Sequence, residues 1–491
     1  MAVKGFAWAG EPLEPLSKEQ EQLVHERSLD VLQRIGVSTT NDRTLKIMAE
    51  QGQDVDFEER RIRFDPAFVE QQIALGRGYY TLGARDPEND LVLDGRHGYI
   101  SSEGCLAEIY DPAIGDRRYS SKEDLEAMTR LSDALPQIAF LWQPVSANDK
   151  IVPVRPMHET HAQWSNTTKH IQQMTAVDPF NARGILEMAT VVAGSAEALR
   201  ERPLISNFQC AISPLHWDDG PVDAIELLGQ AGIPVGLVSM PLLAATSPAS
   251  VAGTLVLANA EILSGMVIQQ TLVPGAPTFY TCYATTMDMN SGALNNGWGP
   301  EDLTFEIAGG QMARRYGVPS SSGILATGAK QSDWQAGMQT AFSAFEKAVS
   351  PSDMLSGAGS YNGSAVFSAV QMILDCEVSD IAMRWAEGYS FDAEQLAVEV
   401  IEHVGPGGHF LGEPHTLQHM RDFWRSKVMN RLTWEDWDAA GRPEPWKAAE
   451  AEVQRILAEH EPEPLPEDVT KELDRIMDAY EAEAMENMED D

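Results

Sequence analysis

Residues 204–240 read LISNFQCAISPLHWDDGPVDAIELLGQAGIPVGLVSM and contain a structural unit that the rest of the chain repeats. Two short apolar runs, 204–209 and 235–240, flank a segment at 221–231 in which apolar residues recur with helical spacing. A buried strand, a helix and a second buried strand in succession are typical of a parallel β/α unit. The segment therefore predicts an α/β fold.

The same rhythm extends over residues 96–388. Apolar runs recur about every 30 to 43 residues, which is the length of a strand, a helix and two loops. The eight runs are 99–102, 138–143, 170–175, 204–209, 235–240, 278–283, 321–326 and 354–357. Eight repeats predict a (β/α)8 TIM barrel as the catalytic domain. A doubly wound open sheet is the alternative, but neither a Gly-x-Gly-x-x-Gly string nor a P-loop follows any run.

Two extensions flank the predicted barrel. Residues 1–95 predict an N-terminal extension of mixed helix and β structure, in which Ser17 and Gln20 mark the start of a helix. Residues 389–491 predict a C-terminal helical extension. Six of its last eleven residues are acidic, so we expect a solvated, frayed tail.

The charge of the chain excludes several classes of partner. The 491 residues include 36 Lys and Arg against 74 Asp and Glu, which gives a formal net charge of −38. Such a surface repels phosphate backbones and anionic lipid, so we expect neither nucleic acid nor a membrane as partner. The longest apolar stretch, 249–269, is interrupted by Asn259 and Glu261 and predicts a buried helix instead of a membrane span.

The cysteines indicate a reducing compartment. Their positions, Cys105, Cys210, Cys282 and Cys376, fit neither a disulfide framework nor a closed zinc site. The N-terminus lacks the long apolar segment of a signal peptide. We therefore expect a cytoplasmic protein.

The ends of the predicted strands supply the candidate site, because TIM-barrel active sites lie at the carboxyl ends of the strands. These ends carry amides, aromatic rings and small residues, and lack the Lys of a Schiff-base aldolase or the ligand set of a metal hydrolase. Aromatic walls suit a quaternary ammonium ion, which is held by cation–π contacts. The alternative is that the rings only fill the barrel core. The candidates from the strand ends are Glu103, Trp142, Gln143, Gln172, Phe208, Gln209, Tyr280, Tyr283 and Tyr361.

The histidines do not predict a metal site. His158 and His161 are spaced for one helix face, but no third ligand accompanies them. His409, His415 and His419 lie in a stretch interrupted by glycine and proline, for which loop packing is the simpler interpretation.

Four strings then connect the chain to a known family: TGAKQSDWQAG at 327–337, SGAG at 356–359, LDCE at 374–377 and, most distinctive, GPGGHFLGEPHT at 405–416. With these strings the chain resembles the trimethylamine methyltransferase family, corrinoid-dependent enzymes built on a (β/α)8 barrel. The resemblance spans residue 17 to about residue 431. Founding members carry pyrrolysine, whereas this chain has standard residues near Lys330 and Gln331, which is similar to the non-pyrrolysine branch.

The resemblance implies the activity. A methyl group would pass from a quaternary amine, such as glycine betaine or a related betaine, to the Co(I) of a cognate corrinoid-binding protein, with no cofactor held tightly by this chain. A quaternary nitrogen leaves as a neutral amine, so the enzyme mainly positions the partners and excludes water. Lys330, Gln331 and Glu103 are then the candidate catalytic residues, and Trp334 joins the substrate-binding set.

Recognition of a betaine also requires a group for its carboxylate. Charged candidates near the strands are Lys330, Arg155, His158 and His170. The amides Gln143, Gln172 and Gln209 are alternatives.

Two other functions remain open from the sequence: a corrinoid-independent barrel enzyme of the lyase type acting on similar amines, and a non-catalytic betaine-binding relative. We expect a homo-oligomer, because long helices are appended to the barrel. The sequence specifies neither the number of copies, nor the betaine, nor the final methyl acceptor.

Overall fold

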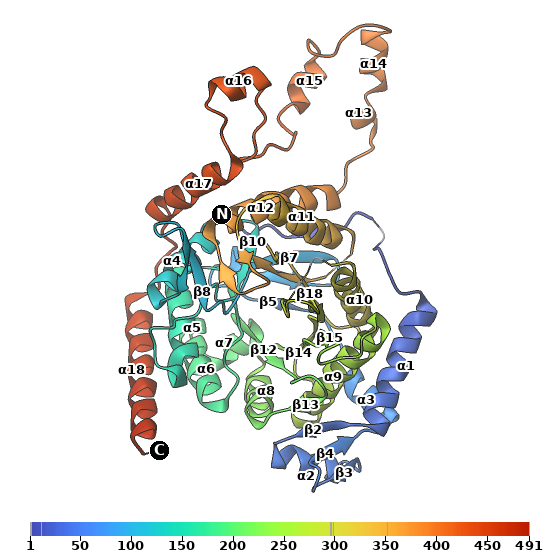
Figure 1. Ribbon diagram of the computed structural model, residues 1–491, viewed down its shortest axis with the longest axis vertical. Coiled ribbons are helices and arrows are strands. Elements are labelled where there is room, and N and C mark those ends of the chain that lie inside the picture. Colours follow the sequence, from blue (N-terminus) through green and yellow to red (C-terminus); the bar gives the residue numbers. More distant parts are fainter. Residues whose placement is uncertain (1, 11, 295–296, 298, 351, 491) are drawn as a thin grey trace.

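The computed structural model describes residues 2–10, 12–294, 297, 299–350 and 352–490. Within them, parallel strands close into a barrel surrounded by helices (Figure 1). The strands, in order around the barrel, are β7 (His97–Ser102), β10 (Ile138–Leu141), β11 (His170–Gln173), β12 (Ile205–Cys210), β14 (Val235–Ser239), β16 (Thr278–Cys282), β18 (Ser320–Ile324) and β19 (Met354–Ala358). Pairing of β19 with β7, through Met354 and Tyr99, closes the ring. The predicted (β/α)8 barrel is confirmed.

Helices follow the strands because a cap residue comes soon after many strand ends. Asp178, Ser250, Asp333 and Ser368 each accept a hydrogen bond from a backbone N–H in the first turn of a helix. The helices that cover the barrel are α4 (Lys122–Ala134), α5 (Arg155–Asn166), α6 (Pro179–Ala193), α7 (Ala196–Glu201), α8 (Asp219–Ala231), α9 (Val251–Leu272), α10 (Pro300–Tyr316), α11 (Trp334–Val349) and α12 (Ala369–Ala386).

Helix α9 is the one described helix that is long and apolar enough to cross a membrane by length and composition alone. Its most apolar window is 78% buried. It packs against α1 (Lys18–Arg34), α3 (Pro66–Leu75) and the barrel strands β14 and β16. These contacts make it the buried helix that its polar interruptions predicted.

The N-terminal extension covers one side of the barrel and closes the end at which the strands begin. We call this amino end of the strands the lower end of the barrel. Strands β2 (Val37–Thr39), β3 (Asp54–Asp56) and β4 (Arg61–Arg63) form a small sheet with β13 (His216–Trp217), and α2 (Asp42–Glu50) packs beside it.

A hairpin of β5 (Tyr80–Leu82) and β6 (Leu91–Leu93) lies at the amino ends of the barrel strands. Leu82, Leu91 and Leu93 are buried in the same cluster as the side chains inside the barrel. The lower end of the barrel is therefore sealed by hydrocarbon.

Short β elements surround the opposite, carboxyl end of the strands. Strands β8 (Glu108–Asp111) and β9 (Asp116–Tyr119) form a sheet with β20 (Ser360–Tyr361) and β21 (Val366–Phe367). A parallel pair, β15 (Leu242–Leu243) and β17 (Thr285–Thr286), follows β14 and β16. We call this end the barrel mouth.

The C-terminal extension has two helices docked on the barrel. Helix α17 (Pro445–Glu459) packs on α12 and α4, and α18 (Glu467–Asp490) packs on α6 and α5. The expected acidic tail is exposed over residues 485–488, but it is helical instead of frayed, because α18 continues to Asp490. The reason is an apolar stripe on α18, including Leu473, Ile476 and Ala484, that is buried against the barrel.

Between α12 and α17 the chain leaves the barrel. Residues 389–443 include the short helices α13 (Ala393–Leu396), α14 (Val398–Val404), α15 (Pro414–His419) and α16 (Trp434–Ala439). They project from the rest of the molecule beyond α11 and α12 (Figure 1).

Candidate functional site

The alternation of side chains along the barrel strands determines which residues face the interior. On β12, Phe208 belongs to the cluster inside the barrel. Its neighbour Gln209 points the other way, and its Nε2 donates to the carbonyl of Ala176 (2.8 Å) and to Oδ1 of Asn207 (2.7 Å). Successive side chains of a barrel strand face alternately inward and outward, so only every second predicted residue reaches the interior.

Three aromatic rings meet near the mouth end of the interior. The ring centroid of Trp142 lies 5.3 Å from that of Phe208 and 6.0 Å from that of Tyr283, with the planes nearly perpendicular. Phe208 and Tyr283 are 6.4 Å apart. All three are buried. We call Trp142, Phe208 and Tyr283 the aromatic cluster.

Hydrogen bonds inside the barrel hold two of these rings. Nε1 of Trp142 donates to Oε1 of Gln172 (2.6 Å), whose Nε2 donates to the hydroxyl of Ser206 (3.0 Å). The hydroxyl of Tyr283 lies 2.9 Å from the hydroxyl of Ser321. The polar tips of the rings are satisfied, and the ring orientations are therefore fixed.

Glu103 supplies a carboxyl group at the mouth end of this cluster. It follows the last residue of β7 and is 3% exposed. Its carboxyl accepts hydrogen bonds from the hydroxyl of Ser364 (2.8 Å) and from the backbone N–H of Gly104 (3.0 Å). Gly104 lies so close to Trp142 that a Cβ added to it would lie 2.6 Å from the tryptophan Cβ. The backbone after Glu103 therefore packs directly against Trp142 of the aromatic cluster.

The electrostatics of Glu103 follow from its burial. Removal from water raises its carboxyl pKa above the ordinary value of 4.5, while the hydrogen bonds from Ser364 and Gly104 act in the opposite direction. Burial also raises the pKa of the Tyr283 hydroxyl, and the negative charge of Glu103 adds to that shift. The carboxyl and the aromatic cluster therefore share one electrostatic environment, which is chemically suited to a cation.

The structure directs three other predicted residues away from this cluster. The Tyr280 hydroxyl donates to Oδ1 of Asn259 on α9 (3.1 Å), outside the barrel. Gln143 points outward too, and its Nε2 donates to the hydroxyl of Thr175 (3.0 Å). With Gln209 they form an outward-facing set. The period-two pattern of each strand was the signal that separates them from Trp142, Gln172, Phe208 and Tyr283.

The loop after β18 holds three more predicted residues at the surface. Lys330 and Gln331 are exposed, and Nζ of Lys330 donates to the carbonyl of Gly328 (2.5 Å). Trp334, the first residue of α11, is 78% exposed. The structure does not bring these side chains to the aromatic cluster.

Tyr361 is buried at the mouth but belongs to a different group. Its hydroxyl lies 2.5 Å from that of Ser332, and its ring meets the edge of Tyr110 at 6.4 Å. Together with Gln331 and Trp446, these residues line a cavity of about 380 Å³ beside α17.

The loop after β18 is anchored by Asp375, a carboxylate that the sequence did not single out. Asp375 on α12 accepts hydrogen bonds from the N–H of Gly359 (2.8 Å) and from Nε2 of Gln371 (2.7 Å). Gln371 in turn accepts from the hydroxyl of Ser332 (2.9 Å). Burial raises the pKa of Asp375 to about 7. The LDCE string contained this residue, but its contact with Gly359, 16 positions earlier, is not visible in the string.

A second overlooked carboxylate, Glu159 on α5, lies behind the outward-facing glutamine. It accepts from the hydroxyl of Thr175 (2.9 Å), the N–H of Ala147 (3.1 Å) and Nε2 of Gln143 (3.4 Å). Burial raises its pKa. Its hydrogen bonds tie the ends of β10 and β11 to α5, which indicates a structural role.

A buried ion group lies behind β18. Nζ of Lys347 contacts the carboxylates of Glu306 (3.2 Å) and Glu346 (2.5 Å). Burial raises the pKa of both carboxyl groups. Gly323 in β18, with φ of +107°, leaves the space that the lysine occupies. The group joins α10 and α11 to the strand.

The charged residues that the sequence offered for the carboxylate do not reach the aromatic cluster either, whereas the alternative Gln172 does. His170 begins β11, and its Nδ1 donates to the carbonyl of Gly83 (2.6 Å) at the sealed end of the barrel. His158 lies 3.6 Å from Glu481 of α18. Burial lowers the pKa of each imidazole to about 4. Arg155 lines a separate cavity of about 650 Å³.

Three other histidines that the sequence singled out, His161, His415 and His419, lie in two places. His161 pairs with Asp474 of α18 (2.9 Å). The ring centroids of His415 and His419 lie 4.3 Å apart in the projecting segment, with the ring planes inclined at 47°. Among the residues that the structure describes, no group of three or more His, Cys, Asp or Glu is arranged to hold a metal ion.

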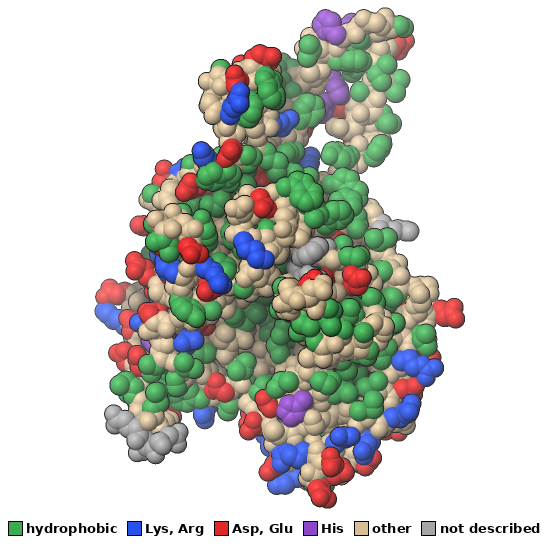
Figure 2. Space-filling view, in the orientation of Figure 1, with side chains coloured by type: hydrophobic (Ala, Val, Ile, Leu, Met, Phe, Trp, Pro, Cys, Tyr) green, Lys and Arg blue, Asp and Glu red, His purple; other side chains and the backbone are tan. Residues whose placement is uncertain are grey.

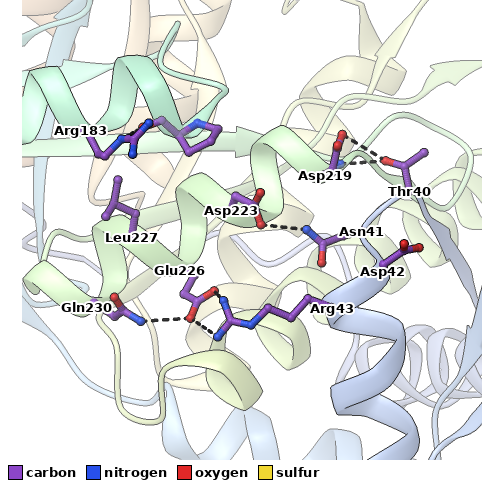
Figure 3. Close-up of a pocket in the computed structure, with 11 residues that line it drawn as sticks. Thr40, Asn41, Asp42, Arg43, Arg183, Asp219, Asp223, Glu226, Leu227 and Gln230 are labelled. Carbon is purple, nitrogen blue, oxygen red and sulfur yellow. Dashed lines mark hydrogen bonds and ion pairs between the residues drawn. The ribbon is translucent and has the colours of Figure 1, made fainter.

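A cavity of about 790 Å³ lies outside the barrel between α2, α6 and α8. Figure 3 shows the side chain of Arg43 pointing toward Glu226 and that of Asn41 pointing toward Asp223. Nη2 of Arg43 donates to Glu226 (2.6 Å), and Nδ2 of Asn41 donates to Asp223 (2.8 Å). These groups satisfy each other and connect the N-terminal extension to the barrel, so this cavity carries no separate chemistry.

With this geometry established, the comparisons with known proteins identify the class. The profile of the trimethylamine methyltransferase (MTTB) family matches residues 4–484, and the chain belongs to that family. It is a methyltransferase, as the sequence predicted.

Two curated relatives come from Desulfitobacterium hafniense. The chain is 33% identical over 481 residues to "Trimethylamine methyltransferase MttB" of strain DSM 10664 / DCB-2, covering 98% of this chain and 96% of the relative. It is 31% identical over 462 residues to "Glycine betaine methyltransferase" of strain Y51, covering 93% and 95%.

Among solved structures, the monomethylamine methyltransferase MtmB of Methanosarcina barkeri matches with a TM-score of 0.50 and 10% sequence identity. It covers 91% of this chain and 88% of that one. At this identity the match supports the barrel fold alone.

Proposed function

We propose that this chain demethylates a quaternary amine, glycine betaine or a related betaine, and delivers the methyl group to a corrinoid carried by a separate protein. The observation that carries the proposal is the aromatic cluster with the buried carboxyl of Glu103 beside it at the barrel mouth. Ring faces and a carboxylate attract a permanently charged nitrogen, which needs no hydrogen-bond acceptor. The similarity to a glycine betaine methyltransferase supports this choice of substrate.

The residues fit a reaction in which the nucleophile comes from outside. A Co(I) corrinoid carried by the partner would supply the electron pair for the new bond to the methyl carbon. The old C–N electron pair stays on nitrogen, so the amine leaves neutral and no proton is transferred. The side chains at the site have matching properties: Trp142, Phe208 and Tyr283 offer ring faces, and Glu103 offers charge.

The task of this chain is then to bind and orient. The aromatic cluster holds the ammonium group and keeps water from it, which restricts the approach of a methyl carbon to one direction. The sealed lower end leaves the mouth as the route of approach. We further propose that the protein acts in the cytoplasm and that the corrinoid protein docks at this mouth.

The test supplies purified chain, a panel of quaternary amines and trimethylamine, and a reduced Co(I) corrinoid. We expect the Co(I) absorption to disappear only when chain and a quaternary amine are both present. Demethylation at full rate without corrinoid or reductant would instead favour the lyase alternative. Binding of the amine without any turnover would favour a non-catalytic relative.

Matched variants connect the activity to the site. Trp142→Ala is expected to raise KM for the quaternary amine by about 10-fold, which is the order of one strong cation–π contact. Tyr119→Ala, on an exposed hairpin, serves as the control and should leave KM unchanged. Equal effects of the two variants would contradict the proposed site.

A further inference from the structure

Residues 389–443, which we call the arm, lack a core of their own. None of the residues in α13, α14, α15 or α16 is buried. The hydrogen bond from Nε2 of Gln418 in α15 to Glu394 in α13 (2.8 Å) joins two parts of the arm to each other. The arm is attached to the body near its middle, where Nε1 of Trp424 donates to Asp380 (2.8 Å). Figure 1 shows the arm standing clear of the barrel.

The arm is nevertheless rich in large apolar side chains. Phe391 is 79% exposed, Leu411 87% and Phe423 66%. Leaving such large apolar side chains in water is unfavourable, because each square ångström of exposed apolar surface costs about 25 cal/mol. Two further exposed side chains, Leu417 and Trp434, extend the surface over α15 and α16.

A second exposed apolar surface lies on the body beside the root of the arm. We define it as the α11/α12 patch: Trp334, Phe342, Phe345, Ile381 and Trp385. The three residues of α11 follow helical spacing along one face, and the ring of Phe345 lies 5.1 Å from that of Trp385 on α12. Figure 2 shows hydrophobic side chains gathered beneath the arm, where α11 and α12 lie.

The middle of the arm is less acidic than the chain as a whole. Residues 403–431 contain four Lys and Arg against two Asp and Glu, in a chain of net charge −38. The arm as a whole still carries nine Asp and Glu against five Lys and Arg, so its apolar side chains, and not its charge, are the feature that favours burial.

We propose that the arm of one chain packs on the α11/α12 patch of a second copy, and that the exchange is reciprocal. The patch ends at the C-terminus of α12 and the arm begins three residues later, so one two-fold axis would cover both surfaces on both copies.

The available area suits a stable dimer. Aromatic side chains bury about 150–250 Å² each, so Tyr389, Phe391, Phe410, Phe423 and Trp434, as exposed here, offer roughly 600 Å². A standard interface needs about 800 Å² per partner, and the leucines of the arm supply further area.

The exchange has a consequence for the site. Trp334 of the patch begins α11 immediately after the loop that holds Lys330 and Gln331 at the barrel mouth. The arm of the second copy would therefore lie at the rim of the mouth. This gives the exposed Trp334 a role in subunit contact, in place of the predicted role in substrate binding.

The first experiment measures the mass of the full chain in solution by analytical ultracentrifugation over a range of concentrations. We expect the wild type to sediment as a two-fold assembly. Phe345→Asp in the patch and Phe423→Asp in the arm should each raise the dissociation constant by at least about 30-fold. Ile114→Asp is the control, because Ile114 is 62% exposed on a hairpin turn away from both surfaces. Circular dichroism of each variant shows that it is folded.

The second experiment identifies the surfaces in contact. One chain carries Leu411→Cys and a differently tagged chain carries Phe345→Cys, and the mixed proteins react with a bis-maleimide. A product joining the two tags supports the exchange. A monomeric wild type, a dimer that survives both Asp variants, or cross-linking confined to single chains would each overturn it. Loss of corrinoid-protein binding on Phe423→Asp, with the wild type monomeric, would assign the arm to that other partner.

Discussion

Glu103 shows how one buried carboxyl group acquires a function from its surroundings. Burial favours its neutral form and raises its pKa above 4.5. A quaternary cation against Trp142 brings a positive charge that no proton can neutralise. That charge stabilises the carboxylate, so the pKa of Glu103 must fall when the cation binds.

This coupling predicts proton release on binding. Titration calorimetry of tetramethylammonium, repeated in two buffers with different ionisation enthalpies, should show protons released at pH values just above 4.5, where Glu103 is still partly protonated. Glu103→Gln should abolish the release and weaken binding by about 10-fold. Glu108→Gln, in an exposed pair with Arg117, is the control. Identical heats in both buffers for the wild type would refute the coupling.

Tyr283 allows ring and hydroxyl to be separated. Tyr283→Phe keeps the ring and loses the hydrogen bond to Ser321, so cation affinity should change little. Tyr283→Leu removes the ring face and should weaken cation binding by a further 0.5–2 kcal/mol, about 2- to 30-fold. Fluorescence titration with a quaternary amine measures both. Equal affinities of the two variants would argue that the ring only fills space.

At the scale of elements, the chain of hydrogen bonds from Asp375 through Gln371 to Ser332 holds the loop of Lys330 against α12. Burial raises the pKa of the Asp375 carboxyl from 3.8 to about 7. The folded state therefore keeps a proton that the unfolded state loses in this interval. Its contribution to stability is complete below 3.8 and is lost as the pH rises through about 7.

The resulting prediction concerns the slope of stability against pH. Denaturant unfolding of Asp375→Asn should show a free energy of unfolding that declines less steeply than the wild type between those two pH values. The difference should amount to a few kcal/mol, since each pKa unit corresponds to about 1.4 kcal/mol. Asp116→Asn, in an exposed strand, should follow the wild-type curve. If the curve of Asp375→Asn ran parallel to that of the wild type, the Asp375 carboxyl of the wild type would be charged over this whole pH range.

The same elements show what the sequence predicts and what it does not. The eight strands were predictable because each apolar run is a local signal that repeats. The inward direction of Trp142 and the outward direction of Tyr280 depend on the register of each strand in the closed ring. The contact between Glu103 and Ser364 joins residues 261 positions apart, and no local pattern announces it.

At the scale of the whole molecule, α18 binds the end of the chain to the barrel. Ile476 is 2% exposed and belongs to the same core as the barrel helices. The C-terminal helix is thus part of the main cooperative unit, because its apolar stripe has no other core to join.

We therefore expect Ile476→Ala to lower the free energy of unfolding by about 2–4 kcal/mol while a single transition remains. Met485→Ala on the exposed face of α18 should change it by less than about 0.5 kcal/mol. Thermal denaturation followed by circular dichroism measures both. A separate early transition for α18 would show instead that the helix is an independent appendage.

The leucine hairpin beneath the barrel has a consequence for traffic through the enzyme. Leu82, Leu91 and Leu93 close the barrel at the amino ends of its strands, which leaves the mouth for the entry of substrate. Under the proposed reaction, the spent amine must depart through the passage by which fresh amine arrives. A corrinoid protein docked at the mouth must dissociate before the amine can leave, so its dissociation rate sets an upper limit on kcat.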